Sequence, residues 1–285
     1  DERGSKEIIV IHAIVVTYNV CCFDSKTCQS LAKQTSHDFD VVVYDNSVRD
    51  FGNQEFCDNH GWIFLGGAGN KGLSVAYNAA IDFLCQDGAS GWICLLDDDT
   101  SLPENFMQRM SEYSAANYSS DILLPILWQS GKIISPCRIQ RKNRYFSSIE
   151  ECLNTKPYEL QAFNSCMTIK MSAFADYRYD ERIFLDGVDH AFLRDMKSKG
   201  KLITVVPIEC EQRFSGGEKA PKNAAISRFR IYSKDSLILH EKEICRYWAI
   251  VGRRALHLSL MYRTPIFIWY LFADSKRGGI QNKTT

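Results

Sequence analysis

The sequence predicts an α/β domain with a mostly parallel central sheet flanked by helices, followed by a C-terminal helical extension. Apolar, β-branched runs alternate with stretches of helical periodicity between residues 8 and 215, which is the pattern of a parallel sheet covered on both faces. Several of these apolar runs stop abruptly at polar residues. Because open α/β sheets bind ligands beyond the carboxyl ends of their strands, these polar residues locate a candidate site.

The predicted elements follow one another along the chain. Strands are expected at residues 8–17, 40–44, 62–65, 93–96, 164–170 and 202–208, and helices at 26–34, 73–85 and 191–199. Residues 125–157 are irregular and could form a hairpin or flap over the site. Residues 218–227 are expected to be mobile, and 236–262 has the periodicity of one long amphipathic helix.

The composition is that of a folded protein of the cytoplasm. With 285 residues, 45% of them hydrophobic and 24% charged, the chain is long enough for one large domain and an appendage. Its 11 cysteines form no CxxC pair, and most lie in apolar runs, so we expect buried, reduced thiols at such positions as Cys85, Cys94, Cys166 and Cys245. We find neither a signal peptide nor an apolar run of about 20 residues that would span a bilayer.

The net charge of zero hides an asymmetry between the two predicted parts, 1–215 and 216–285. The extension carries 13 Lys and Arg against 5 Asp and Glu, whereas the preceding part carries 21 against 29. A basic extension suggests contact with an anionic surface, and nucleic acid is disfavoured because no nucleic-acid-binding motif is present. The aromatic run 265–272 suggests an interfacial membrane anchor, with packing onto the protein or a second subunit as the alternative.

Three consecutive carboxylates, Asp97, Asp98 and Asp99, follow the apolar run 93–96. Adjacent carboxylates repel one another, and a divalent cation such as Mg²⁺ or Mn²⁺, which prefers oxygen ligands, would remove that cost. The alternative is an acidic turn ahead of a helix that begins at Pro103.

Two further stretches contain candidate site residues. The glycine cluster 66–72 contains a formal GxGxxG, but a dinucleotide fingerprint belongs after the first strand, whereas this cluster follows the third. We interpret it as a loop where backbone approaches a ligand, with Asn70 and Asn78 as polar contacts, or as a tight turn. Asp186 and Asp189 bracket a turn before a helix, where N-capping is the alternative to a role in a site.

Five short motifs occur in a characteristic order. They are Val15-Val16-Thr17-Tyr18-Asn19, Val43-Tyr44-Asp45-Asn46-Ser47, Asn70-Lys71-Gly72 with Asn78, Leu95-Leu96-Asp97-Asp98-Asp99, and Phe184-Leu185-Asp186-Gly187-Val188-Asp189. Together they resemble the family-2 inverting glycosyltransferases of the Rossmann-like GT-A fold, and among these the bacterial rhamnosyltransferases. The resemblance extends over about residues 8–215.

The resemblance implies nucleotide-binding roles for the first four motifs. Thr17, Asn19 and Asp45 would line the base and ribose pocket, with the Asp45 carboxylate accepting the imide N–H of uracil or thymine. The remaining nucleotide-binding candidates are Asn70, Gly72, Asn78, Asp97 and Asp98. Of these, Asp98 is expected to point away from the site and to tolerate replacement by Asn.

The resemblance also implies a catalytic arrangement. Asp189 would be the general base for the acceptor hydroxyl, and Asp186 would orient the acceptor or cap the helix. Asp99 would hold Mg²⁺ or Mn²⁺ on the diphosphate, with Asp97 on ribose or a metal-bound water. Where family members carry a metal-binding histidine after this helix, the chain has none, so either Glu211 replaces it or Asp99 and the phosphates suffice.

By resemblance, the donor would be dTDP-rhamnose or a UDP-sugar. The acceptor would be a hydroxyl of a bacterial surface glycan such as lipopolysaccharide or of a lipid-linked glycan. The protein would lie at the inner face of the cytoplasmic membrane as a peripheral protein, and it could act as a homodimer. One alternative is an Asp-dependent phosphohydrolase. It is disfavoured because the aspartate motif of those enzymes follows the first strand, whereas Asp97, Asp98 and Asp99 follow a later strand. The other is a non-catalytic nucleotide-sugar or glycan-binding module of an envelope-assembly complex, which would need no base such as Asp189.

Overall fold

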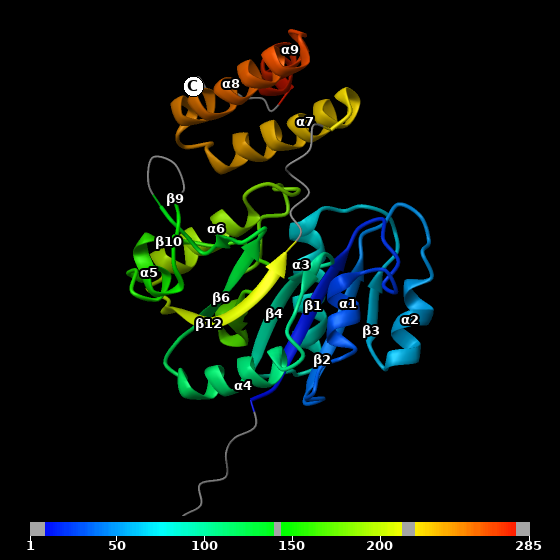
Figure 1. Cartoon of the computed structure of the whole chain (residues 1–285). Helices are drawn as coiled ribbons and strands as arrows, with labels where there is room; N and C mark the ends of the chain where they lie inside the picture. The colour runs from blue at the N-terminus through cyan, green and yellow to red at the C-terminus, as the bar shows by residue number, and fades with distance from the viewer. Residues whose placement is uncertain (1–8, 140–143, 213–219, 278–285) are drawn as a thin grey trace, which may run out of the picture.

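The computed structural model describes residues 9–139, 144–212 and 220–277, and Figure 1 shows its architecture. A central sheet lies between two layers of helices, and three more helices follow at the C-terminal end. The predicted α/β fold with a mostly parallel sheet and a helical extension is confirmed.

The described part of the chain forms a nine-stranded central sheet. Its strands are β1 (Ile11–Thr17), β2 (Phe39–Asp45), β3 (Ile63–Gly66), β4 (Trp92–Asp97), β5 (Thr100–Ser101), β6 (Ile122–Gln129), β7 (Lys132–Ser135), β11 (Thr168–Lys170) and β12 (Ile203–Gln212). The order is β3-β2-β1-β4-β11-β6-β12-β5, with β7 also paired to β6. Strands β3, β2, β1 and β4 are parallel, so their carboxyl ends meet at one edge of the sheet.

Side chains that alternate along the strands build one core on each face of the sheet. In β1, Ile14 and Val16 join the core on one face, whereas Ala13 and Val15 join the core on the other. The first core is covered by α3 (Leu73–Gln86), α5 (Ile149–Leu153) and α6 (Val188–Ser198), and the second by α1 (Lys26–Leu31), α2 (Asn53–His60) and α4 (Phe106–Ala116).

The segment 125–157, predicted to be irregular, is more regular than expected. Strand β6 continues through Pro125 and turns back in a hairpin with β7. The sheet tolerates this proline because β12 bulges opposite it, where the register jumps from Val205 to Glu209. Beyond the hairpin lies a small sheet of β8 (Cys137–Arg138), β9 (Arg144–Tyr145) and β10 (Leu160–Gln161), preceded at β10 by the 3₁₀ turn Pro157–Glu159.

The C-terminal extension differs from the prediction in two respects. Residues 218–227 were expected to be mobile, but α7 (Lys222–Leu239) begins within them. The single helix expected at 236–262 is two helices, because a polar turn at residues 240–243 separates α7 from α8 (Ile244–Tyr262). The predicted boundary at residue 215 lies outside the described residues.

The aromatic run 265–272 forms most of the last helix, α9 (Ile266–Arg277). Its Phe267 and Leu271 are buried against α7 and α8 in a core of their own, while Trp269 remains exposed. One face of the run therefore packs onto the protein, and the other is open to a further contact.

Eight of the 11 cysteines are buried, and all are free, as the expected reduced thiols require. Cys85 and Cys245 are exposed, against expectation, because each lies on the outer face of its helix. Within residues 9–139, 144–212 and 220–277, none of the helices combines the length and the hydrophobicity needed to cross a bilayer.

Candidate active site

Three parallel strands deliver their last residues to the same place. In the register of the sheet, Thr17 of β1 lies beside Asp45 of β2, and Val16 lies beside Asp97 of β4. The Thr17 hydroxyl donates a hydrogen bond of 3.3 Å to the Asp45 carboxylate. The structure therefore brings together three of the residues that the motifs single out, at the edge where the fold class places a ligand.

Asp45 is buried and held in place by its neighbours. Besides Thr17, its carboxylate accepts hydrogen bonds from the Ser47 amide at 2.9 Å and from the side-chain amide of Asn53 at 3.0 Å. These contacts use three of the roughly four acceptor positions of a carboxylate, which leaves one for a ligand. The motifs did not identify Asn53, which reaches Asp45 from the first turn of α2.

The loops after β1, β2 and β3 are tied to one another. The Asn19 amide donates to Ser47 Oγ at 2.8 Å, and Asn19 itself adopts a left-handed conformation with φ of 53°. Asn46 Oδ1 accepts the amide of Lys71 at 2.7 Å, and Asn70 Oδ1 accepts the amide of Gly72 at 3.0 Å. These bonds hold Asn19 and Asn70 at the same edge of the sheet as Asp45.

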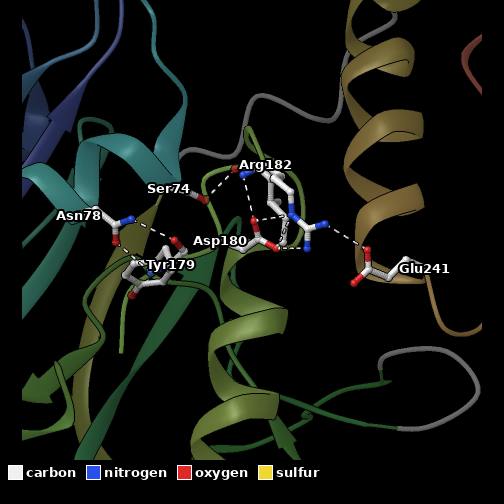
Figure 2. Close-up of polar contacts among 7 residues, drawn as sticks. Ser74, Asn78, Tyr179, Asp180, Arg182 and Glu241 are labelled. Atoms are coloured by element: carbon white, nitrogen blue, oxygen red, sulfur yellow. Dashed lines mark hydrogen bonds and ion pairs between the residues drawn. The ribbon is translucent and has the colours of Figure 1, made fainter. Parts of the chain in front are cut away.

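Two of the predicted nucleotide contacts are engaged with the protein. Asn78 is buried on α3, and its amide donates to the Tyr179 carbonyl at 2.9 Å and accepts the Tyr179 amide at 2.9 Å, as Figure 2 shows. Gly72 has φ of 92°, and a Cβ there would lie 2.8 Å from the Phe184 ring. Both residues pack against the segment that precedes α6, and their contact with a nucleotide stays a prediction.

The side chains of the three adjacent aspartates, Asp97, Asp98 and Asp99, point in two different directions. Gln212 Nε2, at the end of β12, donates to Asp97 at 3.0 Å and to Asp99 at 3.4 Å. Asp98 instead accepts the backbone amide of Tyr18 at 3.1 Å, in the loop after β1. Asp97 and Asp99 therefore share one donor, and Asp98 is turned toward the neighbouring loop.

Burial and mutual repulsion make these carboxylates bind protons more readily than usual. Burial, followed by the charges of Asp99 and Asp98, raises the pKa of Asp97 to about 7. Burial is also the main cause that raises the pKa of Asp98 to about 6 and the pKa of Asp99 above its usual value. A cation at this position would offset the same repulsion.

Glu211 does not join the carboxylates, which corrects its assignment as a metal ligand. Successive strand residues face opposite sides of a sheet, and it is Gln212, 5% exposed, whose side chain reaches Asp97, while Glu211 is exposed. Within the described ranges no three His, Cys, Asp or Glu side chains form a group that could hold a metal. Asp97 and Asp99 still fit Mg²⁺, which proteins commonly bind through one or two carboxylates together with substrate phosphates.

Asp189 and Asp186 occupy different surroundings on either side of the helix start. Gly187 is the N-cap of α6 and has no side chain to cap the helix, whereas Asp189 accepts the first-turn backbone amide of His190 at 2.7 Å. Asp189 lies in the first turn of α6, where burial raises its pKa, and this turn follows directly on the segment that packs against Gly72. Asp186 forms a bidentate ion pair with Arg228 of α7, in which each carboxylate oxygen accepts one guanidinium N–H.

A family model described as glycosyl transferase family 2 matches residues 12–177, more than half of the chain. The chain belongs to glycosyl transferase family 2. The predicted family and its GT-A fold are confirmed, and the predicted glycosyltransferase class with them.

Solved structures of S. aureus TarS share this fold. The chain matches one TarS structure with a TM-score of 0.51 and 17% identity over 80% of this chain and 40% of that chain. It matches TarS 1–349 in complex with UDP with a TM-score of 0.51, and the UDP-GlcNAc complex with a TM-score of 0.50, each at 17% identity, over 66% and 67% of those chains. Among curated proteins, no sequence match was found.

The raised pKa of Asp97 predicts a pH-dependent stability difference. Between its usual pKa and about 7 the folded state binds more protons than the unfolded state, so this residue lowers the free energy of unfolding as the pH rises. Asp97→Asn should therefore raise Tm in EDTA at about pH 8 and leave it nearly unchanged at about pH 4. Thermal unfolding at both pH values measures this, and an equal or lower Tm for the variant at the higher pH would contradict it.

Proposed function

We propose that this glycosyltransferase transfers a sugar from a nucleoside diphosphate donor to an acceptor hydroxyl with inversion, using Asp189 as the base. The observation that carries the proposal is the convergence of Thr17, Asp45 and Asp97 at one sheet edge. Asp189 lies in the first turn of α6, directly after the segment that packs on Gly72. Family membership supports it independently.

The donor base would bind beside β1 and β2. The acceptor position left on Asp45 suits the imide N–H of uracil or thymine, which only a hydrogen-bond acceptor recognises. Thr17 and Asn19 would complete this pocket, and Asn70 and Gly72 would border the nucleotide. Because UDP and dTDP share the imide, the pocket suits both dTDP-rhamnose and a UDP-sugar, and the TarS complexes with UDP and UDP-GlcNAc favour testing UDP-sugars first.

The diphosphate would lie against Asp97 and Asp99. These carboxylates and the amide oxygen of Gln212, a buried atom with no hydrogen-bond partner among the described residues, would hold Mg²⁺ or Mn²⁺. The cation would supply Lewis-acid stabilisation of the charge that develops on the leaving diphosphate. Asp98, held by the Tyr18 amide, would support the loop after β1.

The acceptor hydroxyl would meet Asp189. A raised pKa brings a carboxylate closer to neutral pH, which suits a general base that takes a proton as the hydroxyl attacks the anomeric carbon. A single displacement of this kind inverts the configuration. Asp186, fixed by Arg228, would border the acceptor.

The acceptor would be a bacterial surface or lipid-linked glycan, reached at the inner face of the cytoplasmic membrane. Exposed apolar side chains on α8 and α9 support membrane contact, namely Leu256, Leu260, Trp269 and Phe272. Arg253 and Arg254 are exposed on the same helix as the first two, which suits anionic headgroups. The helices lie at one end of the molecule, beyond the end of β12 (Figure 1).

Asp189→Asn should separate binding from turnover. The amide keeps the shape of the side chain but takes no proton, so kcat should fall by about 10² to 10⁴-fold while donor Kd is unchanged. UDP release from UDP-GlcNAc and calorimetric titration with UDP measure the two quantities. Asp98→Asn is the control and should keep kcat. A larger loss of kcat for Asp186→Asn than for Asp189→Asn, at unchanged Kd, would make Asp186 the base and Asp189 the residue that borders the acceptor.

Asp99→Ala should remove the metal dependence of donor binding. The loss of one of two carboxylate ligands should weaken Mn²⁺-dependent UDP binding by about 100-fold or more. Glu211→Ala is the matched control, because this exposed carboxylate precedes Gln212 but faces away from the aspartates. Near-wild-type turnover of Asp99→Ala in EDTA would contradict the metal assignment.

Membrane contact predicts that surface variants of the last two helices lose vesicle binding without loss of folding. Trp269→Ser and Arg253→Gln should each weaken sedimentation with phosphatidylglycerol vesicles, the arginine by about five-fold, since a basic residue near such a surface contributes about 1 kcal/mol. Tyr158→Ser, an exposed aromatic residue of the catalytic domain, is the control. Unchanged vesicle binding by both helix variants would indicate that this face meets protein instead.

A further inference from the structure

The segment 183–187 links the nucleotide side of the site to Asp189. It has no regular secondary structure, and it leads directly into α6, which carries Asp189 in its first turn. Without a helix or strand of its own, its backbone groups need partners from elsewhere in the molecule. The partners come from α3 on one side and from α7 on the other.

Helix α3 holds the start of this segment. Ser74 Oγ donates to the Ile183 carbonyl at 2.7 Å, and the Leu73 amide donates to the Phe184 carbonyl at 2.6 Å. Figure 2 shows Ser74 of α3 reaching toward this part of the chain, while Asn78 of the same helix bonds to Tyr179. A displacement of the segment would therefore also disturb the loop that ends at Gly72, which packs on Phe184.

Asp235 of α7 holds the middle of the segment. Its carboxylate accepts three successive backbone amides, from Phe184 at 2.9 Å, Leu185 at 2.9 Å and Asp186 at 2.7 Å. The side chain comes from 49 to 51 residues further along the chain and is 1% exposed. Burying a carboxylate is costly, and here the cost is offset by three donors that all belong to this segment.

Two neighbours of Asp235 on the same face of α7 reinforce the contact. Arg228, seven residues earlier, forms the bidentate pair with Asp186. Leu239, four residues later, packs so closely on Gly187 that a Cβ there would lie 2.4 Å from its Cδ1. After the helix, Glu241 pairs with Arg182 at 3.2 Å, as Figure 2 shows. This exposed pair is expected to add little.

We propose that Asp235 is a positioning residue of the active site, which sets the path of 184–186 and thereby the placement of Asp189. Arg228 assists it by fixing Asp186. The inference rests on the proposed function in that it takes Asp189 as the base. It assigns to the C-terminal helices a part in catalysis that is distinct from any role in attachment to a membrane.

Asp235→Asn tests the assignment, with Asp274→Asn as the matched control. Asp274 is also a buried carboxylate of the helical extension, 4% exposed, but it pairs with Arg230 of α7 at 3.5 Å. Both variants should lower Tm. Only Asp235→Asn should speed amide hydrogen exchange in peptides covering 184–190 and lower kcat for UDP release from UDP-GlcNAc by about 100-fold, the effect of a misplacement of about 1 Å.

The two readouts separate this proposal from the proposed function. Exchange in 184–190 that matches the wild type in Asp235→Asn overturns the positioning role, whether or not the wild type cleaves the donor. Faster exchange with unchanged kcat in an active enzyme also overturns it. A wild type that neither binds UDP nor cleaves dTDP-rhamnose or UDP-GlcNAc overturns the proposed function, and the exchange result alone then decides whether Asp235 holds the segment.

If Asp235→Asn fails to fold, Arg228→Gln takes its place. Arg228 is half-exposed, and its loss leaves no buried carboxylate without donors. The variant should show the same combination of faster exchange in 184–190 and lower kcat, to a smaller extent. Wild-type values for both quantities in this variant would overturn the proposal.

Discussion

The parallel register of β1, β2 and β4 is the constraint on which the site depends. Because these strands are neighbours and run in the same direction, Thr17, Asp45 and Asp97 end side by side although they are far apart in sequence. A slip of one residue in β4 would turn Asp97 to the other face of the sheet and exchange the side chains of the two cores. The apolar cores therefore fix the register, and the register places the polar groups.

Charge concentration at this edge carries a cost in stability. Asp97, Asp98, Asp99 and Asp189 all have raised pKa values, with burial as the main cause. Gln212 offsets part of the repulsion through its donation to Asp97 and Asp99. In the proposed function, this lower stability of the empty protein accompanies affinity for a cation and a diphosphate.

The C-terminal helices have two surfaces of different character. One surface of α7 meets the segment before α6 through Asp235, Arg228 and Leu239, so it belongs to the organisation of the site. The outer surface of α8 and α9 carries exposed apolar side chains. The core between them, around Phe229 and Phe267, joins the two surfaces into one unit.

The sequence by itself determined six of the nine strands of the sheet, three of the six helices that cover it, and the strand ends that carry Thr17, Asp45 and Asp97. These follow from local periodicity and from abrupt changes of polarity, which leave a pattern within a few residues. The break at 240–243 and the strand through Pro125 escaped prediction, because periodicity continues across the first and a bulge in a distant strand permits the second. Only the tertiary structure decided that the side chain of Gln212, and not that of Glu211, contacts Asp97, and that Asp235 binds the backbone of 184–186. The physical reason is that the face on which a strand residue lies and the segment that a helix contacts depend on packing between segments that are remote in sequence.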